Sequence, residues 1–223
     1  MKTLLITLAF SSGVCGCLGQ GTIQFANYVN GILLAPIYGV EPSNPTLEKH
    51  GQSALGIPSG STTYAGPLLQ GSDYSVALYA GPKGAPASAL QLVATSTFRS
   101  SSENDLPAGL WFSSAVAVPG VSHGQRAEVE LRVWDNKNNT VNTWNEAQAD
   151  GTVPQGRSGA FSPLGVLGAG LGTVTGPAAD SPLNLVGLTS FNLTAVPEPL
   201  SIGVFALSCG LMLLMRRKPK SAN

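Results

Sequence analysis

Residues 126–135 read Arg-Ala-Glu-Val-Glu-Leu-Arg-Val-Trp-Asp, the clearest strand pattern in the chain. Its apolar residues are Ala127, Val129, Leu131 and Val133, and they alternate with polar or amphipathic residues. Because successive side chains of a strand point to opposite faces, this period of two predicts one buried face and one solvated face. One-sided strands are typical of antiparallel sheets, which can meet water on their second face. The stretch therefore predicts an antiparallel sheet that packs on a core.

The second face of this strand carries Glu128, Glu130, Arg132 and Trp134. We interpret its charged residues as a solvated face, because the two carboxylates of a glycosidase normally flank a cleft. Two interpretations of Trp134 stay open. Its ring is either exposed or packed beneath Trp144 and the helix expected there, and packing is favoured.

Several other segments favour short strands, each bounded by Gly, Pro, Ser or Asn residues that are typical of turns. The candidates are residues 21–27, 32–40, 74–80, 90–99, 110–118, 161–167 and 187–193. Pro119-Gly120 indicates a turn. Residues 41–71 are rich in Pro, Ser, Gly and Thr, and residues 168–182 are rich in Gly. Both stretches predict loops, and a surface loop as long as 41–71 is usually functional or mobile.

One short helix is expected at residues 143–149. Thr143 can cap its N-terminus, and Glu146 follows three residues later, which is the spacing of a capping box. Short strands, frequent turns and almost no helical periodicity predict an all-β fold. We expect residues 20–195, called the body below, to form a single antiparallel β-sandwich of jelly-roll or Greek-key type with this one helix.

The formal net charge of the chain is zero, but its two ends produce this balance. The chain has 12 Lys and Arg residues and 12 Asp and Glu residues. Five of the basic residues and one acidic residue lie outside the body, which leaves seven basic and eleven acidic residues within it. An acidic body lacks the basic surface that nucleic-acid binding requires, so we expect no nucleic-acid partner.

The body offers little of the chemistry that enzymes use. Cys15, Cys17 and Cys209 all lie outside it, so it has neither a disulfide nor a thiol nucleophile. His50 and His123 lie in loop-like segments without His or Cys neighbours at metal-ligand spacing. No Gly-x-Ser-x-Gly stretch stands between an expected strand and an expected helix. We therefore expect no catalytic residue, no metal site and no cofactor.

The run Asp135-Asn136-Lys137-Asn138-Asn139 offers several oxygen atoms to a calcium ion. A calcium loop needs Asp or Asn at its third position, and Lys137 stands there. A turn is therefore the favoured interpretation of this run.

Three aromatic residues support a second function class. Carbohydrate-binding sandwiches stack sugar rings on exposed aromatic side chains, and the candidates for this role are Trp134, Tyr64 and Tyr79. The alternative function is therefore a carbohydrate-binding module anchored by one transmembrane helix. The favoured function is a surface protein without such a site.

Residues 1–19 have the layout of a secretory signal peptide, with Lys2, an apolar run and then small residues up to Gly19. This layout favours cleavage before Gln20. A lipoprotein signal with Cys17 as the lipidated residue is the less favoured alternative.

Residues 200–215 contain no charged residue and no proline. In lipid, only a helix satisfies such a backbone, and this one would be about 24 Å long, against a hydrocarbon core of about 30 Å. The segment predicts a short transmembrane helix. Arg216, Arg217 and Lys218 mark its cytoplasmic end, followed by a tail of residues 219–223.

Pro197-Glu198-Pro199 precedes the expected span, and its prolines favour an extended chain there. The order of this triplet, an apolar span and a basic end resembles the PEP-CTERM sorting signal of Gram-negative bacteria. The resemblance covers residues 196–218 and implies an exosortase, a membrane-embedded transpeptidase-like enzyme, as the partner. It also implies that Pro197, Glu198 and Pro199 are the processing motif. A plain single-span anchor is the alternative.

These observations predict a non-enzymatic exported protein. We expect a precursor anchored in the inner membrane and then a form at the cell surface or in the extracellular matrix. An association with exopolysaccharide or a biofilm is the further expectation, and no activity follows from the resemblance.

The mature protein is expected to begin at Gln20, because signal peptidase cleaves after small residues such as Gly19. N-terminal sequencing of the protein taken from its native cells checks this. A retained Met1, or a lipid on Cys17, would contradict it.

Overall fold

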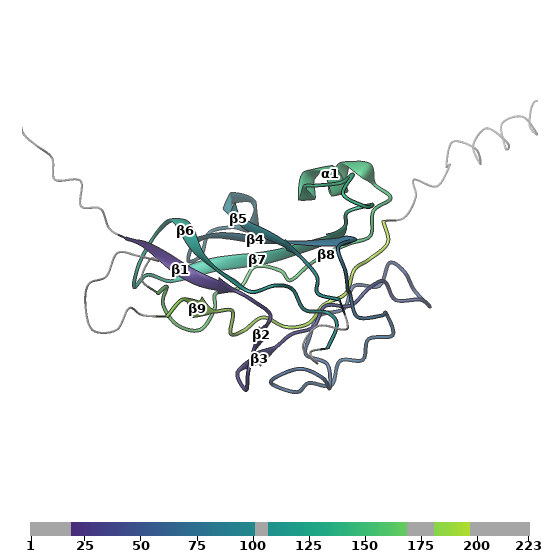
Figure 1. Ribbon diagram of the computed structural model, residues 1–223, viewed down its shortest axis with the longest axis horizontal. Helices are drawn as coiled ribbons and strands as arrows, with labels where there is room; N and C mark the ends of the chain where they lie inside the picture. The colour runs from purple at the N-terminus through teal and green to yellow at the C-terminus, as the bar shows by residue number, and fades with distance from the viewer. Residues whose placement is uncertain (1–18, 101–106, 169–180, 197–223) are drawn as a thin grey trace, which may run out of the picture.

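The structure, a computed structural model, describes residues 19–100, 107–168 and 181–196. In these residues the chain forms short strands, one α-helix, α1 (Trp144–Asp150), and one 3₁₀ turn, η1 (Ala87–Ala89). The strands are β1 (Gln20–Phe25), β2 (Tyr28–Val29), β3 (Leu33–Leu34), β4 (Tyr74–Pro82), β5 (Gln91–Thr97), β6 (Ser114–Ser122), β7 (Ala127–Asp135), β8 (Gln155–Arg157) and β9 (Leu183–Asn184). The expectation of a mainly β protein with one short helix is confirmed (Figure 1).

The larger sheet has the strand order β5-β4-β7-β8, and all its pairs are antiparallel. β4 and β7 pair along their whole length, from Tyr74 opposite Asp135 to Pro82 opposite Ala127. The four alternating apolar residues of β7 are at most 1% exposed, which confirms the predicted strand and its core face.

The second sheet has the order β6-β1-β9. β1 runs antiparallel to β6 but parallel to β9, so the expectation of a purely antiparallel fold is wrong for this pair. Between β1 and β4 in the sequence, the chain forms the small β2–β3 hairpin.

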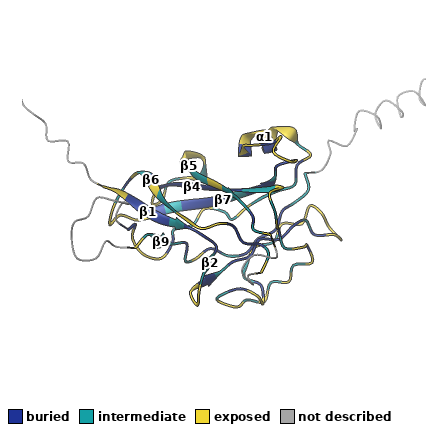
Figure 2. Ribbon diagram, in the orientation of Figure 1, coloured by how far each residue is buried: buried dark blue, intermediate teal, exposed yellow. Residues whose placement is uncertain are grey.

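One apolar core joins the two sheets. Phe25 of β1, Val118 of β6 and Leu185 beside β9 belong to the same buried cluster as Leu78 of β4 and Leu131 of β7. Figure 2 shows the buried positions concentrated on β1, β4 and β7, where the two sheets approach each other.

The opposite face of the larger sheet lies under α1 (Figure 1). The Thr143 hydroxyl accepts from the Glu146 amide at 3.2 Å, and the Glu146 carboxylate accepts from the Thr143 amide at 3.0 Å. The predicted capping box is therefore confirmed, and Gly151 ends the helix in the left-handed region. Trp144 and Ala147 of α1 are buried against the sheet.

β6 begins and ends four residues later than the predicted strand 110–118, and Pro119-Gly120 lies inside it instead of forming a turn. Two features of the sheet explain the error. β6 is an edge strand, where a proline is tolerated, and its pairing with β1 shifts register between Ala117 and Ser122.

Three other expected strands are mostly irregular chain. Of residues 32–40 only β3 is a strand, and residues 161–167 make an isolated bridge at Phe161. Residues 187–193 make bridges at Phe191 and Asn192, while the neighbouring strand is β9. These segments still contribute buried side chains to the core cluster.

Residues 1–18 of the expected signal peptide 1–19, the sorting motif and the span 200–215 lie outside the described residues. Within the ranges that the structure describes, no helix combines the length and the apolar character needed to cross a bilayer.

Replacing Leu131 by Ala is expected to lower the free energy of unfolding by about 2 to 5 kcal/mol, because this fully buried side chain leaves a cavity in the joint core. A guanidinium titration of the full-length chain in nonionic detergent, followed by tryptophan fluorescence, measures the change, since all three tryptophans lie in the body.

Leu92→Ala is the control, because Leu92 is 51% exposed and its truncation should cost less than about 0.5 kcal/mol. Equal shifts of the two midpoints would show that Leu131 does not face a core.

Candidate functional site

Trp134 lies in the interior of the protein. Its side chain is 1% exposed, and its indole N–H donates to the Val141 carbonyl at 2.9 Å. The ring of Trp144 meets it edge-on, with the ring centroids 6.3 Å apart. A ring enclosed in this way cannot stack on a sugar, so Trp134 is excluded as a glycan-stacking residue. The predicted packing beneath Trp144 is confirmed.

Tyr79 is half-buried beside this cluster, and the Arg132 guanidinium carbon lies 3.9 Å from its ring centroid. Arg132 donates from Nε and Nη2 to one oxygen of Glu130, at 2.7 and 2.6 Å, and from Nη2 to the Ala87 carbonyl at 3.1 Å. One face of the Tyr79 ring is therefore occupied by a cation.

Glu130 is only 1% exposed, so the expectation that it lies on a solvated face is wrong. Its carboxylate is buried because Arg132, held over Tyr79, pairs with it there. A buried charge of this kind requires such a partner. Glu128, by contrast, is partly exposed.

Tyr64 belongs to a separate cluster, in the long loop of residues 41–71. Its ring stacks on Tyr38 with centroids 4.1 Å apart, and its hydroxyl donates to the carbonyls of Gly51 and Ser190 at 2.7 and 2.8 Å. Burial is the main cause that raises the pKa of this hydroxyl, which therefore stays protonated and acts as a donor. Tyr64 thus fastens the loop to the end of the body, and no shared aromatic platform joins it to Tyr79.

Glu41, at the start of the same loop, is 2% exposed. Its carboxylate pairs with the Lys49 ammonium at 2.8 Å and accepts from the Ala65 amide at 3.1 Å. The hydrogen bond from Lys49 is the main cause that lowers the pKa of Glu41 below its ordinary value of 4.5. The ammonium also donates to the Thr63 carbonyl at 2.8 Å. This loop is therefore tied together by polar contacts around the buried Glu41 carboxylate.

The run from Asp135 to Asn139 forms a turn, as favoured from the sequence. The Asn136 amide nitrogen donates to the Ser72 carbonyl at 2.6 Å, and its oxygen accepts from the Asn139 amide at 3.0 Å. Asp135 accepts from the Lys137 amide at 2.8 Å. The side-chain oxygens of Asp135 and Asn136 thus serve the turn itself.

A depression of the described surface lies at one end of the molecule, between two tight turns. The Ala85 amide donates to the Pro82 carbonyl at 3.0 Å after β4, and the Gln125 amide donates to the Ser122 carbonyl at 3.1 Å between β6 and β7. A further bond, from the Lys83 amide to the Arg126 carbonyl at 3.2 Å, joins the two turns. Backbone contacts therefore hold the rim together.

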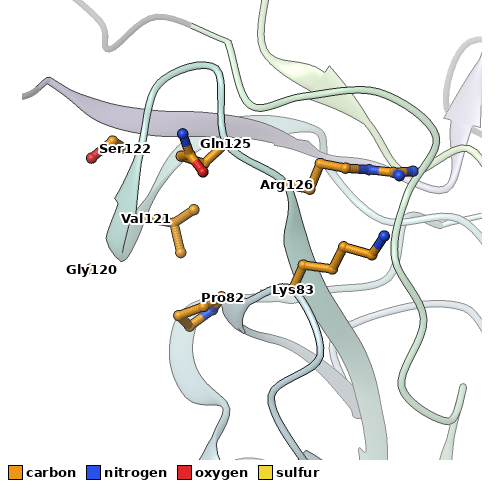
Figure 3. Close-up of a pocket in the computed structure, with 7 residues that line it drawn as sticks. All are labelled: Pro82, Lys83, Gly120, Val121, Ser122, Gln125 and Arg126. Carbon is orange, nitrogen blue, oxygen red and sulfur yellow. The ribbon is translucent and has the colours of Figure 1, made fainter.

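We call this depression the turn pocket; its volume is about 430 Å³. It is lined by Pro82, Lys83, Gly120, Val121, Ser122, Gln125 and Arg126. Figure 3 shows both basic side chains extending toward the same side, away from Gly120 and Ser122. The lining is therefore cationic on one side and neutral on the other.

The basic side chains of the turn pocket differ from most others in the described chain. Lys49, Arg132 and Lys137 each pair with a carboxylate of the protein itself. Within the described residues, Lys83 and Arg126 form no ion pair and no side-chain hydrogen bond, although the body as a whole is acidic. Their charges are available to a ligand.

Residues 120–124, of which the first three line the pocket, read Gly-Val-Ser-His-Gly and so match Gly-x-Ser-x-Gly in letters. They lead from β6 into β7, whereas a nucleophile elbow leads from a strand into a helix. The match therefore lacks the structural context that a catalytic serine needs.

Sequence reasoning missed the turn pocket. Lys83 and Arg126 lie far apart in the sequence, and only the pairing of β4 with β7 brings Pro82 opposite Ala127. The residues after β4 and before β7 are typical of turns, but no local pattern shows that these two turns meet. The sorting residues 197–199 and the basic cluster 216–218 lie outside the described residues.

The described residues hold no group of three or more His, Cys, Asp or Glu side chains placed to bind a metal ion. No family model, no curated protein and no solved structure matches the chain.

The lowered pKa of Glu41 predicts an acid-sensitive contribution to stability. A carboxyl whose pKa is lower in the folded state stabilises the fold above its ordinary value of 4.5, and this stabilisation is lost as the pH falls through the folded pKa. Glu41→Gln should therefore flatten the decline of the melting temperature between about pH 5 and pH 3, measured by tryptophan fluorescence.

Glu48→Gln is the matched control, because it removes an exposed carboxylate of the same loop. The wild-type slope should persist in this variant. A Glu41→Gln profile parallel to the wild type would contradict the role of the Lys49 pair.

Proposed function

We propose that the chain is a non-enzymatic exported protein of the cell surface or extracellular matrix, sorted by an exosortase-type membrane enzyme. The observation that carries the proposal is the order of sequence features in residues 196–218. A Pro-Glu-Pro triplet, an uncharged span and the cluster Arg216-Arg217-Lys218 follow one another there. The apolar span and basic end suit an inner-membrane precursor, and the extended triplet suits an enzyme active site.

The body fits the cargo of such a tail. We propose that it is a β-sandwich of jelly-roll or Greek-key type, because both sheets contribute to one buried cluster. Packing holds this cluster together without a cysteine, so the body needs no disulfide after export.

The end of the body supports a separate sorting segment. Thr194 and Gln155 exchange two backbone hydrogen bonds, at 2.9 and 3.0 Å, and the Ala195 amide donates to the Pro45 carbonyl at 2.7 Å. The Pro-Glu-Pro triplet begins two residues further on, at Pro197. The contacts of the body reach Ala195, and cleavage at the triplet would leave them intact.

The internal pairing of charges supports a non-enzymatic role. Among the described residues, the buried carboxylates are those of Glu41 and Glu130, and each is paired with a basic side chain of the protein itself. General acid–base catalysis needs a titratable group within reach of a substrate, and these two carboxylates are enclosed by their partners.

Stacking of a sugar on Trp134, Tyr64 and Tyr79 is not the function we propose. Trp134 is buried, and each tyrosine has one ring face covered, by Tyr38 in one case and by Arg132 in the other. No observation on these three aromatics favours the carbohydrate-binding alternative.

Changing Pro197 and Pro199 together to Ala tests the sorting proposal. The substitution should let a helix extend upstream from the span and so remove the extended segment that an active site binds. In cells that carry an exosortase, uncleaved precursor should accumulate in the inner membrane while the surface form disappears. Cell fractionation and blotting for the body measure both forms.

A double change in the body, Pro42→Ala with Pro86→Ala, is the control, because both prolines are exposed. This variant should be released like the wild type. Equal release of the Pro197/Pro199 variant and the wild type would refute sorting and leave a plain single-span anchor.

A further inference from the structure

We propose that the turn pocket binds an acidic sugar, a ligand that carries an oxyanion beside hydroxyl groups. This inference goes beyond the sorting proposal and does not depend on it. It rests on the charge, the polarity and the construction of the pocket.

The charge of the pocket selects an anion. Lys83 and Arg126 both line it, and neither is neutralised by another described side chain. An oxyanion in the pocket can form charge-assisted hydrogen bonds with these two side chains. Guanidinium and ammonium groups are the usual partners of carboxylate and phosphate oxygens.

Glu128, two residues after Arg126 in the sequence, does not take this role. One oxygen of Glu128 accepts from the Gly84 amide at 3.2 Å and from the Ser162 hydroxyl at 2.7 Å. The Glu128 carboxylate is thus engaged beside the pocket and is absent from its lining. Its contacts fix the turn that carries Lys83.

The uncharged residues of the lining favour a sugar as the remaining part of the ligand. The Ser122 hydroxyl and the Gln125 amide can each donate and accept hydrogen bonds, as sugar hydroxyls require. The exposed ring of Pro82 supplies apolar contact for the C–H groups of a sugar ring. Figure 3 shows these residues on the side opposite to the charged ends, so the ligand needs an oxyanion at one end and hydroxyl groups at the other.

The size and the rigidity of the pocket also fit. Its volume of about 430 Å³ falls in the range of small-molecule sites, and one sugar unit needs less space than this. The two turns that form it are closed by their own hydrogen bonds, with Gly84 at a φ of 81° and Gly124 at 75°. A preformed site loses little conformational entropy on binding.

Titration calorimetry of the full-length chain in nonionic detergent tests the proposal. Galacturonate and glucose 6-phosphate distinguish a carboxylate source from a phosphate source of the oxyanion. Glucose and inorganic phosphate separate the sugar from the charge. At least one acidic sugar should bind, at least about tenfold more tightly than either glucose or inorganic phosphate, and more weakly as salt is added.

Arg126→Ala and Lys83→Ala should each weaken the binding of the acidic sugar by about tenfold or more, because each removes a charge-assisted hydrogen bond. Arg157→Ala is the charge-matched control, since Arg157 is an exposed basic residue outside the pocket, and it should change the affinity less than about twofold. Unfolding midpoints by tryptophan fluorescence confirm that the variants are folded.

Several results would overturn the proposal. The first is that neither acidic sugar binds at millimolar concentration. The second is that glucose binds as tightly as the acidic sugars. The third is that Arg157→Ala loses as much affinity as Arg126→Ala and Lys83→Ala. Binding of inorganic phosphate as tight as that of the acidic sugars would also overturn it, because the pocket would then recognise charge alone.

Discussion

The pairing of β4 with β7 is the constraint on which the rest of the structure depends. Its unbroken register places alternate residues of both strands in the joint core and sends the others, among them Tyr79 and Arg132, to the face beneath α1. A slip of one residue would exchange the two faces and bring charged side chains into the apolar core. The same pairing brings the turn after β4 beside the turn before β7, so it also builds the pocket.

The sequence predicted features whose information is local. Alternation in β7 and the Thr143–Glu146 spacing each lie within a few residues, and both appear in the structure as expected. Features set by distant contacts were missed. Pro119 is accommodated in β6 because that strand is an edge, Glu130 is buried because Arg132 pairs with it beneath α1, and the turn pocket needs two turns to meet. No pattern within one segment carries that information.

Partial cover of the second face of the larger sheet explains why this face carries a buried charge, that of Glu130. A buried ion pair such as Glu130 with Arg132 adds little net stability, because removing both charges from water costs about as much as their attraction returns. What the pair does supply is position. Arg132 contacts Glu130, the Tyr79 ring and the Ala87 carbonyl at the same time. These contacts fix the position of η1 relative to the sheet. An apolar side chain would fill the space without that directional specificity.

The contacts made by the last residues of the body affect the order in which the protein can fold during synthesis. β1, the first strand, pairs with β9, and the loop that contains Gly51 is bonded to Ser190. The first strand and the long loop therefore wait for the final residues before their pairing is complete, and such long-range contacts form slowly. In a nascent chain with this topology, these contacts can form only after almost all of the chain has been made. That order of events would suit the export proposed for this chain, because a polypeptide crosses a translocation channel unfolded.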